Sequence, residues 1–202
     1  MTVMLKRRVL RRSLCSTGKM PAKKTDFVDV LRRVEPIVRR LGFLIRYTEN
    51  MDPFFKGDLD GKTIFIGKNL SAEEKLFNLL HLSGHSVQWN ADELLRTLGS
   101  ELYRNPDDEL LRRLQTYEWQ ANCYALSILH QAGQFNLDRW LARKYVIDML
   151  HLTHFYKTGE KLKRITQVAR CYPFNRDLEP KEIPAFVPHS SDRTRNGIVI
   201  AF

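Results

Sequence analysis

Two histidines near the middle of the chain have the spacing of a metal-binding pair. His81 and His85 are four residues apart within residues 71–89, where apolar residues recur at helical intervals. On an α-helix, residues four apart lie about 40° apart around the axis and one turn apart along it. Two imidazoles in this arrangement can bind one metal ion. Taken alone, the pair favours two hydrogen-bonded core histidines, so a further ligand is needed to favour a metal site.

Glu118 can supply that ligand from a second predicted helix. It stands 33 positions after His85 and shares one helical face with Ala121 and Ala125. The two small alanines would let this face approach another helix closely. An isolated buried carboxylate costs several kcal/mol or more, and a zinc ion held by two histidines would compensate that cost. We therefore predict a zinc site formed by His81, His85 and Glu118.

These two segments resemble the ImmA/IrrE family of zinc metallopeptidases. Its members are bacterial and phage proteins with a His-Glu-x-x-His motif on one helix and a Glu-x-x-Ala-Asn-like motif on a later helix. The resemblance covers roughly residues 26–135 and implies that His81, His85 and Glu118 are metal ligands. It implies an α+β fold, a mostly helical zincin-like domain with a small β-sheet ahead of the metal-site helix. Family members cleave repressor proteins, so a protein or peptide partner such as a transcriptional repressor is expected.

Leu82 departs from the family pattern at the position of the general base. The family has a glutamate directly after the first histidine, and leucine cannot accept a proton. Losing a positioned base typically costs roughly a hundredfold to ten-thousandfold in rate. The leading hypothesis is therefore a zinc-binding relative that recognises its partner but is catalytically weakened or inactive. The alternative is an active zinc endopeptidase with another base, for which Asp92 and Glu93 are candidates that no spacing places at the site.

The net charge of +10 suggests a nucleic-acid partner, but most of this charge lies in one segment. Residues 1–24 contain eight Lys and Arg residues and no acidic residue, which leaves +2 on the other 178 residues. A nucleic-acid-associated regulator that uses this basic arm is a second alternative. The arm has the composition of an organellar transit peptide, but the simpler interpretation is that the chain starts at Met20 or that the arm is disordered.

Cysteine usage and hydropathy indicate in which cellular compartment the protein is expected. Cys15, Cys123 and Cys171 show no paired metal spacing and suit a reducing compartment. No apolar run is long enough for a membrane span, and the leader lacks the continuous apolar core of a secretory signal. We therefore expect a cytoplasmic protein without a membrane partner.

Hydrophobic periodicity indicates the elements that must position the site. Predicted helices span residues 26–41, 71–89 and 107–130, and another begins near Leu137. Phe43 to Tyr47 and Lys62 to Ile66 are predicted as the two strands of a hairpin, with the turn-rich Gly57 to Gly61 between them. In zincin-like enzymes such a sheet can pair with an extended substrate. Phe54 and Phe55 are either core residues or part of the cleft in which such a substrate would lie.

Composition divides the chain into four parts. They are a basic disordered leader (1–25), the zincin-like domain (26–135), C-terminal helices (136–171) and an extended, proline-rich tail (172–202). His151 and His154 could bind a second metal ion, but no carboxylate lies at a suitable spacing. The apolar Gly197 to Phe202 could add a strand to the sheet or occupy the cleft.

Overall fold

The computed structural model describes residues 25–49, 56–100, 103, 105–160, 162 and 177–190. Within these residues the chain is mostly helical, with five α-helices and a small three-stranded mixed sheet near the N-terminal end. The sheet precedes the helix that carries the histidine pair, so the predicted fold class is confirmed. Residues 1–24, the pair Phe54 and Phe55, the cysteines Cys15 and Cys171, and Gly197 to Phe202 lie outside the described residues.

Helix α1 (Phe27–Arg40) packs an apolar stripe against the rest of the molecule. Its N-cap is Asp26, whose Oδ1 accepts hydrogen bonds from the backbone N–H groups of Val28 and Asp29. The helix ends before Gly42, which has a φ of +90° that glycine adopts at little cost. Its buried residues are Val30, Val34, Ile37 and Val38.

The sheet pairs its strands differently from the predicted hairpin. Strand β1 (Leu44–Thr48) runs parallel to β3 (Thr63–Gly67), and β2 (Gly57–Leu59) pairs antiparallel with β3, giving the order β1-β3-β2. The predicted strands Phe43 to Tyr47 and Lys62 to Ile66 correspond to β1 and β3, but their assignment as the two arms of one hairpin was wrong. Parallel neighbours cannot be joined by a tight turn.

The observed hairpin is β2–β3, and its turn is set by Asp60 and Gly61. The Oδ1 atom of Asp60 accepts hydrogen bonds from the backbone N–H of Lys62 at 2.8 Å and of Thr63 at 2.6 Å. Gly61 supplies a φ of +97°, so the chain reverses within residues 60–62. The residues before this turn, which the sequence marks as turn-rich, therefore form an edge strand.

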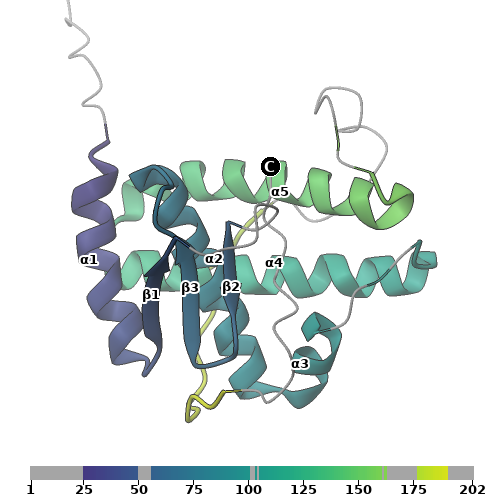
Figure 1. Cartoon of the computed structure of the whole chain (residues 1–202), viewed down its shortest axis with the longest axis horizontal. Helices are drawn as coiled ribbons and strands as arrows, with labels where there is room; N and C mark the ends of the chain where they lie inside the picture. Colours follow the sequence, from purple (N-terminus) through teal and green to yellow (C-terminus); the bar gives the residue numbers. More distant parts are fainter. Residues whose placement is uncertain are drawn as a thin grey trace, which may run out of the picture.

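Helix α2 (Ala72–Ala91) is the central element. Ser71 and Glu74 form a capping box, in which Ser71 Oγ accepts from the Glu74 N–H at 3.3 Å and Glu74 Oε2 accepts from the Ser71 N–H at 3.1 Å. Every residue from Leu76 to Trp89 is buried, as expected for a helix that is apolar around most of its circumference. In Figure 1 the helix passes behind the sheet, between the strands and the long C-terminal helices.

Three more α-helices complete the described fold. They are α3 (Glu93–Ser100), α4 (Asp108–Gln131) and α5 (Asp138–Thr158), with a short 3-10 helix, η1 (Phe135–Leu137), before α5. Asp107 is the N-cap of α4, as predicted, and its Oδ1 accepts from the Leu110 N–H at 2.7 Å. Helices α4 and α5 lie side by side (Figure 1), and Leu141 of α5 belongs to the same apolar core as α1 and the sheet.

The segment 177–190 is extended and packs on the helical part without forming a helix or strand. Both backbone groups of Lys181 form hydrogen bonds with Ser127. The Lys181 N–H donates to Ser127 Oγ at 2.7 Å, and the Lys181 carbonyl accepts from the same hydroxyl at 2.6 Å. Further along, Phe186 stacks on Phe43 with ring centroids 5.5 Å apart. The segment 177–190 therefore contacts both α4 and Phe43, the residue before β1.

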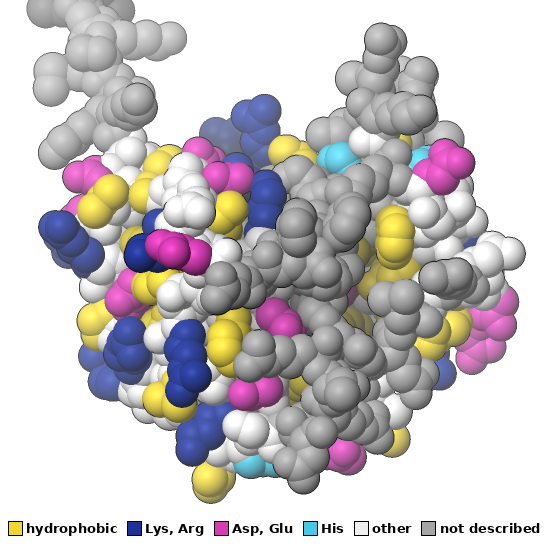
Figure 2. All heavy atoms as spheres, viewed as in Figure 1, with side chains coloured by type: hydrophobic (Ala, Val, Ile, Leu, Met, Phe, Trp, Pro, Cys, Tyr) yellow, Lys and Arg dark blue, Asp and Glu magenta, His cyan; other side chains and the backbone are white. Residues whose placement is uncertain are grey.

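Basic and acidic side chains are interspersed on the surface. On the face shown in Figure 2, Lys and Arg side chains lie over α1 and the sheet with Asp and Glu among them. Two ion pairs between exposed side chains are Arg33 with Asp29 and Lys68 with Glu49, each at 2.8 Å. None of the helices in the described part of the chain has both the length and the apolarity that a membrane span requires.

Candidate metal centre

The three predicted ligands meet where α2 crosses α4. The Nε2 atom of His85 lies 3.1 Å from Nε2 of His81 and 3.1 Å from Oε2 of Glu118. The remaining separation, between His81 Nε2 and Glu118 Oε2, is 3.5 Å. All three side chains are buried, and Glu118 is only 3% exposed. This group could hold a metal ion.

The separations of the donor atoms fit a tetrahedral zinc ion. Bonds of about 2.0–2.1 Å to nitrogen and oxygen place neighbouring ligand atoms of a tetrahedron about 3.3 Å apart. The three measured separations lie on both sides of this value. The donor atoms therefore outline one face of a coordination tetrahedron, and its fourth corner belongs to a group outside this set.

The close approach of the two helices depends on Gly84 and Ala121. A Cβ atom added at Gly84 would lie 2.0 Å from the carbonyl oxygen of Ala121, so no other residue fits at this position without moving a helix. Ala121 and Ala125 are fully buried. The structure thus confirms that the alanine face of α4 packs closely against a helix, and this contact brings His85 within reach of Glu118.

The ring of His85 is oriented by an ordered amide. Gln88 Oε1 lies 2.9 Å from His85 Nδ1, while Gln88 Nε2 donates to the carbonyl of Tyr117 at 2.8 Å and to Gln120 Oε1 at 3.0 Å. These two acceptors fix the amide so that its oxygen faces the ring. His85 Nδ1 therefore donates to Gln88, and His85 Nε2 faces the cluster, as in metal sites whose second ring nitrogen is held by a neighbour.

His81 is held differently, by Asn122. Asn122 Nδ2 lies 3.1 Å from His81 Nδ1 and also donates to the carbonyl of Glu118 at 2.9 Å. Asn122 Oδ1 is buried and has no partner among the described residues. An amide Nδ2 can only donate, so His81 Nδ1 accepts this hydrogen bond and a neutral His81 carries its proton on Nε2. Ligation through Nε2 would require that proton to leave this nitrogen.

Burial and mutual charge shift the pKa values of His81 and Glu118. Burial, reinforced by the neighbouring His85, lowers the pKa of His81 to about 4, so this ring is neutral at pH 7. Burial alone would raise the pKa of Glu118, but the charge and hydrogen bond of His85, together with His81, lower it overall. A neutral imidazole and an ionised carboxylate are the ligating forms.

A second buried carboxylate, Asp148 of α5, lies beside the centre. Its Oδ2 atom is 3.9 Å from His81 Nε2, the side chain is buried, and neither oxygen has a hydrogen-bond partner among the described residues. Burial and the nearby Glu118 raise its pKa well above the usual range, and Lys56 partly opposes this shift. Asp148 is not among the site residues predicted from the sequence, although its spacing from the apolar Leu141, Tyr145 and Leu152 places a carboxylate on a core-facing stripe.

The structure brings neither Asp92 nor Glu93 to the centre. Asp92 caps the following helix, its Oδ1 accepting from the Leu94 N–H at 2.8 Å. The Glu93 side chain is 72% exposed and pairs with Arg96 at 3.7 Å. Leu82 is fully buried and lies against strand β2, where a Cβ atom at Gly57 would meet Leu82 Cδ1 at 2.6 Å.

Two other sequence hypotheses gain nothing from the structure. His151 and His154 join no group of three candidate ligands among the described residues, where the cluster of His81, His85 and Glu118 is found. The basic arm of residues 1–24 lies outside the described residues.

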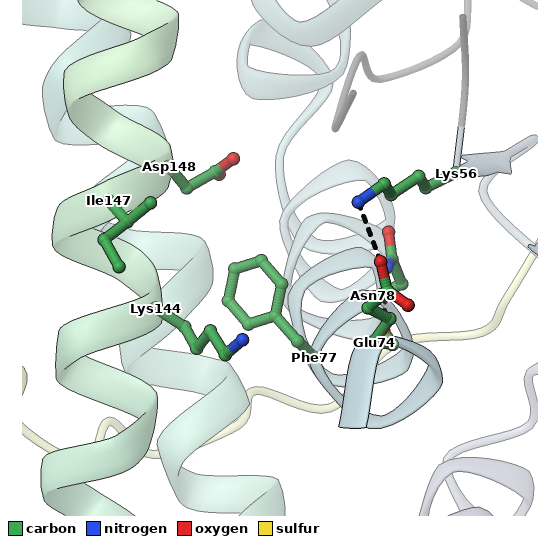
Figure 3. A pocket seen from close by; sticks show the side chains of 7 residues that line it. All are labelled: Lys56, Glu74, Phe77, Asn78, Lys144, Ile147 and Asp148. Atoms are coloured by element: carbon green, nitrogen blue, oxygen red, sulfur yellow. Dashed lines mark hydrogen bonds and ion pairs between the residues drawn. The ribbon is translucent and has the colours of Figure 1, made fainter. Parts of the chain in front are cut away.

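A cavity of about 140 Å³ lies between α2 and α5, next to the centre. Lys56, Glu74 and Lys144 are partly exposed, while Phe77 and Asp148 are buried, so the cavity leads inward from the surface. Figure 3 shows Asp148 and Lys144 reaching in from α5, Phe77 and Glu74 from α2, and the ion pair between Lys56 and Glu74. The Phe77 ring also stacks on His81, with centroids 5.7 Å apart, so one residue separates the cavity from the first ligand.

Comparisons with known proteins assign no relative. No protein-family model matches the chain, and no significant match was found among the curated proteins or the solved structures.

Proposed function

We propose that the chain is a zinc-binding protein of the ImmA/IrrE type, a catalytically weakened or inactive relative of the metallopeptidases that recognises a protein or peptide partner. One observation carries this proposal: the buried donor atoms of His81, His85 and Glu118 lie at the separations of a tetrahedral zinc site. Two histidines and a glutamate with an open fourth position are the donor set of hydrolytic zinc centres. A zinc ion there would lower the pKa of a coordinated water to about 7 and polarise a carbonyl group.

The weakened activity follows from residue 82. Leu82 has no proton acceptor, and its side chain packs against β2. Without a base at the usual position, the rate is expected to fall roughly a hundredfold to ten-thousandfold. Recognition is supported by the neighbouring cavity, where the apolar Phe77 and Ile147 lie beside Lys56 and Lys144. Glu74 and Asp148 share this lining, so a peptide side chain with an apolar stem and a polar end would suit it.

An active zinc endopeptidase is the second candidate, and Asp148 favours it. This carboxylate is buried, has no hydrogen-bond partner among the described residues and lies 3.9 Å from His81 Nε2, so it is a candidate proton acceptor close to the centre on a helix that the sequence alone did not connect to the site.

Zinc content measured by elemental analysis tests the metal centre. The purified chain, after zinc loading and gel filtration, is expected to retain about one zinc per molecule. His85→Ala and Glu118→Ala are expected to lose it, whereas His154→Ala, the same type of change outside the cluster, is expected to keep it. Zinc retention in His85→Ala equal to that of the unmodified chain would overturn the proposal.

A peptidase assay then separates the two candidates. The zinc-loaded chain is incubated with unfolded generic proteins and with repressor-like proteins, and cleavage is followed over time. The weakened relative gives slow or no turnover with zinc still bound. Rapid cleavage that His81→Ala abolishes would favour the active endopeptidase instead.

A further inference from the structure

Asp148 is a buried carboxylate whose oxygens are compensated by no hydrogen bond within the described protein. It lies near a second buried carboxylate, Glu118, and both of its oxygens lack hydrogen-bond partners in the described part of the chain. Buried charges are normally paired, hydrogen-bonded or bound to metal. Carboxylates with perturbed surroundings in a cleft are therefore candidates for a functional role. A divalent cation at the neighbouring histidines would balance the charges of Glu118 and Asp148.

The position of Asp148 suits a contact with the fourth coordination site better than direct ligation. Its Oδ2 is 3.9 Å from His81 Nε2, yet it does not belong to the set of donor atoms that all lie within 4.8 Å of one another. A fourth ligand would lie about 3.3 Å from each of the other three. A carboxylate just beyond that corner could instead accept a hydrogen bond of about 2.7 Å from the group that occupies it.

The cavity gives this carboxylate access to water and to a substrate. Asp148 projects from α5 into the cavity (Figure 3), while the predicted metal ligands come from α2 and α4. A molecule that enters past Lys56 and Lys144 therefore reaches Asp148, and the Phe77 ring lies between the cavity and His81. Leu82, by contrast, faces the sheet. The proton acceptor is thus located across the cavity, on a different helix from the histidines.

We propose that Asp148 faces the open coordination position and accepts the proton of the attacking water, in place of the missing glutamate. The proposal rests on the proposed function, because it requires metal at His81, His85 and Glu118. One O–H bond of water breaks and its proton passes to Asp148, while the water oxygen bonds to the carbonyl carbon of a peptide. The C–N bond then breaks, and Asp148 returns the proton to the leaving amine nitrogen. Water and the peptide are the only reactants consumed.

Zinc retention and the binding of a small zinc ligand test this role without relying on activity. In Asp148→Asn, zinc content is expected to stay at the level of the unmodified chain, because Asp148 is not a ligand. Acetohydroxamate, added to the cobalt-substituted protein and followed by its visible spectrum, is expected to bind about ten- to a hundredfold more weakly, the effect of losing one hydrogen bond to a charged group. Slow peptide cleavage, where measurable, is expected to fall about a hundredfold or more.

The matched control is Asp138→Asn, the same change on the same helix but at a residue that pairs with His130. It should leave both zinc content and acetohydroxamate affinity unchanged. Asp148→Ala is measured in parallel, so that the test stands if the asparagine variant does not fold.

Two results would overturn the assignment. Loss of zinc in the Asp148 variants would make this residue a direct ligand, and unchanged acetohydroxamate affinity would place it away from the open position. Failure of the metal centre itself is distinguishable, because the unmodified chain would then hold no zinc.

Discussion

The two histidines of the centre differ in how completely their surroundings satisfy polar groups. On the His85 side, Gln88 accepts from the ring and donates to two oxygens, so the ring has one fixed orientation. On the His81 side, Asn122 Oδ1 and both oxygens of Asp148 have no partner within the described residues. Satisfied groups preorganise a ligand, whereas unsatisfied ones mark the place where another molecule would bind. The centre therefore has a rigid side toward Gln88 and an unsatisfied side toward α5 and the cavity.

Gly84→Ala should disrupt the centre on both its Gln88 side and its α5 side, and it should have the largest effect. The new methyl group would lie 2.0 Å from the Ala121 carbonyl, so α2 and α4 must separate. We expect a loss of about 3 kcal/mol or more in the free energy of unfolding, together with loss of zinc, measured by urea denaturation and elemental analysis. Gly133→Ala is the control: it meets no atom within 4 Å, and its φ of +72° should cost only about 1 kcal/mol with zinc retained. A stable, zinc-loaded Gly84→Ala protein would contradict the tight crossing.

Gln88→Met should weaken the rigid side alone. It removes the acceptor of the His85 Nδ1 proton while nearly preserving side-chain volume, so zinc affinity is expected to fall about ten- to a hundredfold. Competition with a chromophoric chelator measures the affinity. Gln115→Met is the matched control, since Gln115 is also buried but bonds to Thr153. Equal losses in the two variants would show that orientation of His85 is not the cause.

Asp148→Asn should change the free energy of unfolding of the metal-free protein, and its effect is expected to be the smallest of the three. The raised pKa of Asp148 means that the metal-free protein loses stability as pH rises above about 4, the unfolded value, toward the folded one. Replacing the carboxylate removes this loss, so we expect the metal-free variant to be more stable by about 1–3 kcal/mol at neutral pH. Urea unfolding with a chelator, compared at pH 5 and pH 8, measures it. A gain that does not grow with pH would argue against a buried, uncompensated carboxylate.

The helices could be predicted because their signals are local. Ser71 and Glu74 lie three residues apart at the start of α2 and form a capping box, which depends on neighbouring residues alone. His81 and His85 share a face because the helical period brings residues four apart together. The alanines beside Glu118 predicted a close helix contact, and Gly84 completes it from the other helix. A buried carboxylate on such a face needs a partner, which is why the three ligands could be chosen before their distances were known.

The pairing of the strands could not be predicted in the same way. Phe43 to Tyr47 and Lys62 to Ile66 have the composition of strands, but composition does not distinguish a hairpin from parallel neighbours. The short strand Gly57–Leu59 takes the antiparallel place, because the turn lies at Asp60 and Gly61. Burial on the core side of β2 outweighs the turn-like composition of its residues.

Residue types and helical spacing thus identified the candidate metal ligands and the absence of a base after His81, since a helix fixes which side chains share a face. Only the tertiary structure placed Asp148 beside His81, because that contact joins residues 67 positions apart on helices whose relative position depends on packing of the whole core. The same packing turned Leu82 toward the sheet and opened the cavity toward α5. Local periodicity specifies the faces of helices, and long-range packing decides which faces meet.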